Sequence, residues 1–302
     1  MKIPYFPGCS LKTYASSFEK SAIATGKKLD IEFVEIPRWN CCGVVSSLTS
    51  DDLMHHLAPV RNMIRILEMQ QENSVDTDNK MLTLCSMCMN TLKRSNQRMQ
   101  NNPEDLSTIN DFMYKEEQDY DGSISVVHYL EVLKEYGFDN LAKKIELPLK
   151  GLKVAPYYGC MLIRPKEVGI DDAEEPVIME NLITAMGGDP VEWRAKKTCC
   201  GSYLTVNKQD IVIKLTSKIL EDARENGADV IITSCPLCMF NLDSRQNLIK
   251  EKNPDFEPVP VMYFTQLLAL ALGLEFCDEG FEKNKIDPMP VLNRKIIKKD
   301  ID

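Results

Sequence analysis

The stretch ADVIITSCPLCMFNL (residues 228–242) has a counterpart earlier in the chain, KMLTLCSMCMNTL (residues 80–92). Each begins with a short apolar run, which is typical of a buried strand, and runs straight into a Cys-x-x-Cys motif that opens a helical segment. Strands that alternate with helices form a mainly parallel sheet through right-handed crossovers. The two stretches therefore predict an α/β fold that is written twice along the chain.

The cysteines repeat in the same way. Ten of the eleven occur in one order, Gly-Cys, then Cys-Cys-Gly, then Cys-x-x-Cys, which appears once in each half. The closing segments VVHYLEVLKEYG (126–137) and PVMYFTQLLALALG (260–273) also match, so an internal duplication explains the pattern better than chance. The first copy contains Cys9, Cys41, Cys42, Cys85 and Cys88, and the second contains Cys160, Cys199, Cys200, Cys235 and Cys238.

The pattern predicts two α/β domains, residues 1–150 and 151–285, followed by a charged tail at 286–302. In parallel sheets, sites form at the carboxyl ends of the strands. Every cysteine group follows a predicted strand, so we expect the five cysteines of each copy to gather at one edge of its sheet. The polar, acidic stretch 101–123 is expected to be a mobile connection.

Composition narrows the class of protein. The net charge of −9 argues against nonspecific binding to nucleic acid or to an anionic membrane. No apolar run approaches a membrane span, and the first residues lack the apolar region of a secretory signal, so we expect a cytoplasmic protein. That compartment is reducing, so the cysteines need another explanation than disulfides. Cys277, outside the repeats, is expected to be a buried thiol.

Three chemistries compete for the cysteines. Structural zinc takes four ligands, which leaves a fifth cysteine and an adjacent pair unexplained. A thioredoxin-like Cys-x-x-Cys does not explain the other two motifs. Iron–sulfur chemistry explains more, because thiolates select such clusters, and five cysteines with two adjacent thiols suit a larger or opened cluster. The ferredoxin run of four closely spaced cysteines is missing.

Two copies of C…CCG…CxxC resemble the paired cysteine-rich CCG domains of the heterodisulfide reductase B subunit, over roughly residues 1–275. The resemblance implies two tandem CCG domains related by a pseudo-two-fold axis, with mainly parallel sheets flanked by helices. It also implies two noncubane 4Fe-4S clusters, one on Cys9, Cys41, Cys42, Cys85 and Cys88, the other on Cys160, Cys199, Cys200, Cys235 and Cys238.

The family reaction is reduction of a coenzyme M–coenzyme B disulfide to two thiols. Cleaving an S–S bond takes two electrons, so our hypothesis places the disulfide between two facing clusters that each deliver one. The alternative is an iron–sulfur electron-transfer subunit of a dehydrogenase of the succinate, glycolate or lactate type. The chain has no G-x-G-x-x-G motif after a strand, so we expect it to bind neither flavin nor nicotinamide.

Electrons must then come from partners. The resemblance implies a ferredoxin-type iron–sulfur subunit of the C type and a flavin-containing subunit of the A type, with a hydrogenase or a formate dehydrogenase in larger complexes.

Anionic arms of a substrate would need cations, and guanidinium groups bind sulfonate or phosphate bidentately. Basic residues near the cysteines are therefore candidate substrate contacts. His128, at the start of a closing helix, is a further candidate, although we favour a packed core histidine over a proton donor. The basic candidates are Arg38, Arg164, Lys166, Arg194, Lys196 and Lys197.

Overall fold

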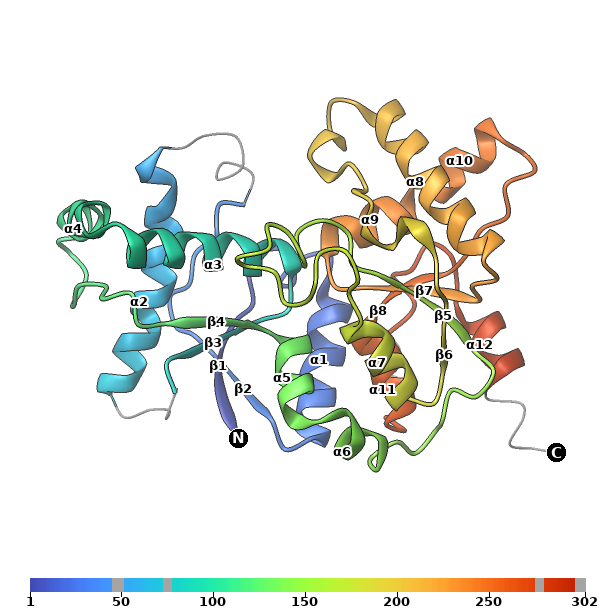
Figure 1. Cartoon of the computed structure of the whole chain (residues 1–302), viewed down its shortest axis with the longest axis horizontal. Coiled ribbons are helices and arrows are strands. Elements are labelled where there is room, and N and C mark those ends of the chain that lie inside the picture. Colours follow the sequence, from blue (N-terminus) through green and yellow to red (C-terminus); the bar gives the residue numbers. More distant parts are fainter. Residues whose placement is uncertain (45–51, 73–77, 275–279, 297–302) are drawn as a thin grey trace. The chain divides into compact units, whose positions relative to one another are not determined.

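The computed structural model describes residues 1–44, 52–72, 78–274 and 280–296 (Figure 1). Cys277 and the last six residues of the expected tail lie outside these ranges. The chain forms two compact units, one of residues 1–16 and 30–132, the other of residues 17–29 and 133–302. In the described residues, each unit contains one four-stranded sheet whose paired strands all run parallel. The α/β class and the repeated parallel sheet are confirmed.

The sheet of unit 1 has the order β2-β1-β3-β4. Its inner strands β1 and β3 are almost entirely buried, because crossover helices cover both faces of a parallel sheet. The strands are β1 (Lys2–Phe6), β2 (Glu32–Glu35), β3 (Lys80–Thr83) and β4 (Ser125–His128). The helices of this unit are η2 (Leu53–His56), α2 (Leu57–Gln71), α3 (Ser86–Asn101) and α4 (Pro103–Phe112).

The sheet of unit 2 repeats that order as β6-β5-β7-β8, with the edge strand β6 reduced to two exposed residues. The strands are β5 (Lys153–Tyr157), β6 (Asp189–Pro190), β7 (Val230–Thr233) and β8 (Val261–Tyr263). The helices that follow β5 are α7 (Ile178–Ala185), η3 (Arg194–Lys197), η4 (Ser202–Leu204), α8 (Gln209–Glu225), α9 (Pro236–Ser244), α10 (Gln246–Lys252), α11 (Phe264–Ala271) and α12 (Met289–Lys295).

Helix α1 (Ser16–Lys28) follows β1 in the chain but packs within unit 2, beside α11 (Figure 1). The ring of Phe18 stacks on Tyr263 with centroids 4.2 Å apart, and the hydroxyl oxygens of Ser21 and Thr265 lie 2.6 Å apart. Helix α5 (Tyr129–Tyr136) passes from unit 1 to unit 2 at residue 133, and α6 (Phe138–Ala142) belongs to unit 2. The contact units thus interleave along the chain, and the division at residue 150 remains a prediction about the repeats.

The segment 101–123 was expected to be a mobile connection, and this was wrong. Helix α4 begins with proline at its first position and has two acidic residues in its first turn, both of which favour a helix start. Ile109 is buried, and so is Tyr120, whose hydroxyl donates to the side-chain oxygen of Asn96 at 2.5 Å. A few apolar side chains therefore anchor a segment whose overall composition is polar.

A buried carboxyl ties the C-terminal segment to unit 2. Asp243, on α9, accepts hydrogen bonds from the backbone amides of Lys285 (2.7 Å) and Ile286 (3.0 Å). Burial raises the pKa of Asp243 to about 6, although the two amides act in the opposite direction. The segment is therefore held by a group that is ionised only above mildly acidic pH.

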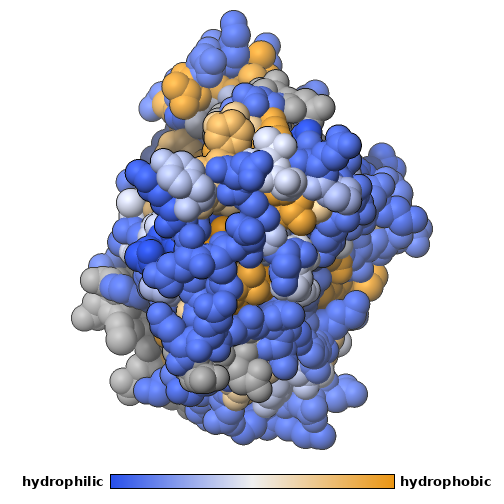
Figure 2. All heavy atoms as spheres, turned by 90° about the vertical axis from the view of Figure 1, so that its left-hand side faces the viewer, coloured by the Kyte–Doolittle hydropathy of each residue, from blue (hydrophilic) through white to orange (hydrophobic). Residues whose placement is uncertain are grey.

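The surface agrees with a chain rich in charged residues. Hydrophilic residues cover most of the face drawn in Figure 2, and apolar residues appear as patches among them. Among the described residues, no helix combines the length and the apolar character that crossing a membrane requires.

Candidate metal centre

The five cysteines of unit 1 gather at the carboxyl edge of its sheet. Cys9 follows β1, the pair Cys41-Cys42 follows β2, and Cys85 and Cys88 stand at the start of α3, directly after β3. The Sγ atoms of Cys9 and Cys41 lie 3.7 Å apart, and those of Cys42 and Cys88 lie 3.4 Å apart. Cysteines separated by up to 79 residues thus share one site, because parallel strands end at the same edge.

Unit 2 repeats this arrangement with its own cysteines. The Sγ atoms of Cys160 and Cys199 lie 3.9 Å apart, and those of Cys200 and Cys238 lie 3.4 Å apart. Cys235 directly precedes α9, as Cys85 directly precedes α3. The two sets match position by position, as the sequence repeat predicts.

Glycine before the first cysteine of each set is required by space as well as by backbone conformation. Gly8 and Gly159 have φ of +72° and +63°, a region that L-residues with a side chain rarely adopt. A Cβ atom on Gly8 would lie 3.1 Å from Cys88 Sγ, and one on Gly159 would lie 3.3 Å from Cys238 Sγ. A side chain at either position would therefore push against a thiol of the site.

The adjacent cysteines of unit 1 follow a residue that is held in place by α2. Asn62, fully buried on α2, accepts from the backbone amide of Asn40 at 2.9 Å and donates to its carbonyl at 3.0 Å. The amide of Gly43 then lies 3.5 Å from Cys41 Sγ, and in unit 2 the amide of Gly201 lies 3.3 Å from Cys199 Sγ. In both units the glycine after the pair directs its N–H to the sulfur two residues back.

In one close pair of cysteines in each unit, the two thiols differ in pKa. A hydrogen bond from Cys160, offset in part by burial, lowers the pKa of Cys199 to about 6, and the same contact together with burial raises the pKa of Cys160. In unit 1, hydrogen bonds from neighbouring thiols lower the pKa of Cys42, and the contact with Cys42 raises that of Cys88. Since the thiolate is the form that binds metal, each set contains a sulfur already disposed to act as a ligand.

The donor set fits an iron–sulfur centre. Each unit offers five soft sulfur ligands, one more than a tetrahedral zinc ion takes, in a partly buried edge of a rigid sheet. In the described part of the chain, no three or more His, Cys, Asp or Glu side chains surround a single ion position. The sulfurs instead form close pairs. The residues that would hold the group are the ten cysteines named above, and this assignment stays a prediction.

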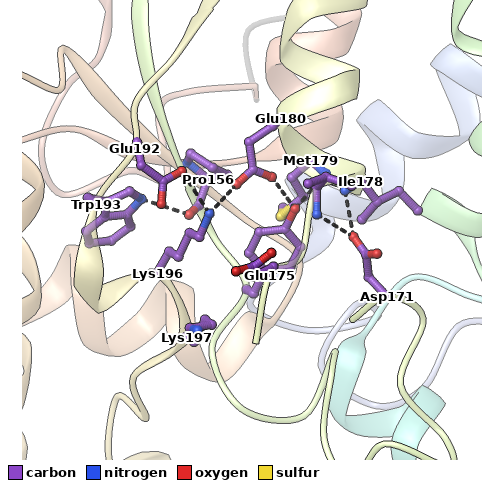
Figure 3. A network of polar contacts seen from close by, with 12 residues as sticks. Pro156, Asp171, Glu175, Ile178, Met179, Glu180, Glu192, Trp193, Lys196 and Lys197 are labelled. Carbon is purple, nitrogen blue, oxygen red and sulfur yellow. Dashed lines mark hydrogen bonds and ion pairs between the residues drawn. The ribbon is translucent and has the colours of Figure 1, made fainter. Parts of the chain in front are cut away.

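Lys196, a candidate substrate contact, lies buried in an ion-pair network (Figure 3). Its ammonium group is 2.8 Å from Glu180 Oε1 and 3.1 Å from Glu192 Oε2, and the Tyr158 hydroxyl also donates to Glu180. The Lys196 carbonyl accepts from the amides of Tyr158 (2.9 Å) and Gly159 (3.1 Å). These contacts connect Lys196 to the loop that carries Cys160.

Three other candidate cations also have carboxylate partners. The Arg164 guanidinium and the Lys197 ammonium lie 2.8 Å and 3.4 Å from the Glu174 carboxylate. The Arg38 guanidinium lies 2.8 Å from the Glu68 carboxylate. These carboxylates would compete with an anionic substrate for the same groups. The remaining candidates, Lys166 and Arg194, are exposed. A role for any of the six in substrate binding stays a prediction.

His128 is fully buried, as expected of a core histidine. Its Nε2 lies 2.7 Å from the carbonyl oxygen of Leu84, which can only accept, so Nε2 carries the proton. Nδ1 then accepts from the amide of Leu130 at 3.2 Å. Burial lowers the pKa of His128 to about 3, so the ring is neutral and both nitrogens are engaged within the protein.

Sequence reasoning missed two asparagines that act on the cysteine loops. Asn62 is described above, and Asn241, on α9, donates to the carbonyl of Cys200 at 3.2 Å. Asn241 could have been noticed, because it lies three residues after the predicted ligand Cys238. Asn62 lies 22 residues after Asn40, and no nearby motif indicates that the two residues are in contact.

Comparison with known proteins places this geometry in a family. The family model of the cysteine-rich domain CCG matches residues 3–93 and again residues 154–243. The chain belongs to this cysteine-rich CCG family. Both matched ranges begin in the first strand of a sheet and end beyond the Cys-x-x-Cys motif, so each includes one complete cysteine set.

Several relatives align with nearly the whole chain. A protein of Wolinella succinogenes named 8-methylmenaquinol:fumarate reductase membrane anchor subunit is 32% identical over 94% of this chain and 96% of its own length. The B subunit of the ferredoxin/F420H2-dependent CoB-CoM heterodisulfide reductase of Methanosarcina acetivorans is 31% identical, over 96% of both chains. A hypothetical protein of Helicobacter pylori superposes with a TM-score of 0.72 at 14% identity, covering 91% of this chain and 49% of that one, which shows the fold alone.

Proposed function

We propose that this protein is the catalytic subunit of a heterodisulfide reductase-type complex. It reduces a disulfide of two thiol coenzymes, of the coenzyme M–coenzyme B type, to the free thiols. The observation that carries the proposal is the pair of matched five-thiol sets, each at the carboxyl edge of its own sheet. Relatives of similar length, named as B subunits of heterodisulfide reductases, support a role in a multi-subunit redox complex.

The reaction consumes two electrons and two protons for each disulfide, breaks one S–S bond and releases two thiols. In the proposal each cysteine set would hold one noncubane 4Fe-4S cluster, and the cluster would supply one-electron chemistry. The chain itself provides the thiolate ligands, and the glycines at positions 8 and 159 give the space in which the sulfurs can close on a bulky group. The protons come from water, and the electrons come from a ferredoxin-type subunit supplied by a flavin subunit. These partners and a cytoplasmic location stay predictions.

The test is anaerobic purification of the complex with iron and sulfide analysis, followed by assay with reduced viologen and the coenzyme M–coenzyme B disulfide. We expect release of two thiols per disulfide. Cys42→Ser and Cys200→Ser should each abolish turnover, whereas Cys277→Ser, outside the repeats, should retain it. Full activity in either of the first two variants would refute the proposal. A colourless protein with zinc and no sulfide would refute it before any assay.

A second function is favoured by the relative from Wolinella succinogenes. In this alternative the same two sites only relay electrons within a complex that oxidises a quinol or reduces fumarate. This second function would be favoured over the first if none of the disulfides assayed yielded thiols and the purified complex carried out quinol-dependent fumarate reduction.

A further inference from the structure

A line of hydrogen bonds in unit 2 ends on the sulfur of Cys200. Asn241 is fully buried on α9, and its Nδ2 lies 3.2 Å from the Cys200 carbonyl oxygen and 3.7 Å from Cys200 Sγ. On its other side, Oδ1 accepts from the Thr205 hydroxyl at 2.5 Å. Arg245 Nη2 lies 3.3 Å from the Thr205 carbonyl and 3.5 Å from the Thr205 hydroxyl, and its guanidinium covers the ring of Phe240.

The direction of this line is determined by its two ends. The Cys200 carbonyl can only accept, so the amide nitrogen of Asn241 must face it, and Oδ1 must face Thr205. The Arg245 guanidinium can only donate, so the Thr205 hydroxyl turns its lone pair to Arg245 and its proton to Asn241. Each donor thus points toward Cys200, and hydrogen bonds aligned in one direction strengthen one another in a buried setting.

Unit 1 has no equivalent of Asn241 at the matching position. Asn241 is the third residue after Cys238, and the third residue after Cys88 is Thr91. The Thr91 hydroxyl donates instead to the carbonyl of Met87, one helical turn back, at 3.0 Å. The two cysteine sets match in their ligands but differ in the residue at this position of α3 and α9.

We propose that Asn241 raises the reduction potential of the centre in unit 2. This rests on the cluster content of the proposed function, but not on the identity of the substrate. A hydrogen bond to a ligating thiolate withdraws charge from the sulfur and stabilises the extra electron of the reduced state. The unit 2 centre therefore holds an electron more readily than it would without this donor, whichever reaction follows. Asn241 is a positioning residue, because it acts through Cys200.

The experiment is an anaerobic redox titration of the purified complex, with the two centres followed by electron paramagnetic resonance. Asn241→Leu keeps the volume and removes the donor. We expect the ratio of reduced to oxidised centre, at a fixed potential, to fall about tenfold for one centre only, which for a one-electron couple is a shift of about −59 mV. The matched control Thr91→Val removes a hydroxyl from the equivalent helix position of unit 1 and should move neither centre.

A second pair of variants keeps the test decisive if Asn241→Leu loses iron. Thr205→Val removes the hydroxyl that orients Asn241 and should shift the same centre in the same direction by a smaller factor, whereas Thr205→Ser should restore the wild-type potential. Unchanged potentials in both Asn241→Leu and Thr205→Val, or equal shifts in Thr205→Val and Thr205→Ser, would overturn the inference. Because no disulfide enters this measurement, its failure is distinct from a failure of the reductase assay.

Discussion

Replacing Lys196 by Met should destabilise unit 2 strongly while preserving the length of the side chain. The Lys196 side chain is 8% exposed and that of Glu180 is 15% exposed, whereas Glu192 is 80% exposed and its contact contributes little. The substitution therefore acts mainly by leaving the Glu180 carboxylate without its cation. That carboxylate keeps one donor, the Tyr158 hydroxyl.

Breaking a buried ion pair by removing one partner costs about 3–5 kcal/mol. The hydrogen bond from Tyr158 and the slight exposure of Glu180 reduce the penalty, so we expect the free energy of unfolding to fall by about 3 kcal/mol, the low end of that range. Lys197→Met is the matched control, because its partner Glu174 is 74% exposed, and it should cost less than about 1 kcal/mol.

Urea unfolding of unit 2 alone can be followed by the fluorescence of a single tryptophan. The chain has two tryptophans, so a Trp39→Phe background leaves Trp193, which is buried in unit 2, as the only one. In that background, Glu180→Gln combined with Lys196→Met should recover part of the lost stability, since a neutral amide oxygen still accepts from Tyr158. Equal losses in Lys196→Met and Lys197→Met, or strictly additive effects in the double variant, would refute the reasoning.

Three further outcomes are expected. The raised pKa of Asp243 means that the folded chain holds this proton more tightly than the unfolded chain, so its contribution to stability is present below about pH 4 and is lost as the pH rises through about 6. Asp243→Asn should remove this fall in the free energy of unfolding between about pH 5 and pH 7.5, measured by urea unfolding. At low pH the variant should be less stable than the wild type by about 1–3 kcal/mol, because its amide nitrogen cannot accept from the second backbone amide. Gly8→Ala should reduce the iron content of the purified chain more than Gly43→Ala, since both have positive φ but only the first would crowd Cys88. Asn62→Leu should lower the free energy of unfolding by about 2 kcal/mol, because it leaves a backbone amide and a carbonyl unsatisfied.

Much of the site could be predicted because its signals are local. A strand of four or five apolar residues, a Gly-Cys turn and a Cys-x-x-Cys at a helix start are each legible within about ten residues of chain. Duplication then doubles the signal, so the α/β class, the repeated parallel sheet and the gathering of the cysteines at the strand ends all follow from the order of motifs. The anchoring of 101–123 was missed because only three buried side chains, Ile109, Met113 and Tyr120, carry it.

What the sequence by itself determined is the repeat, the parallel sheet in each copy, and the residue types that meet at each sheet edge. Tertiary structure alone decided the partners of those residues. Helix α1 packs against β8 and α11, more than 200 residues away in the chain, and Asn241 finds Cys200 across 41 positions. Such contacts depend on which faces become adjacent when the helices cover a sheet. A buried Asn or Lys looks the same in sequence whether it binds a neighbour's backbone, a carboxylate or a thiol.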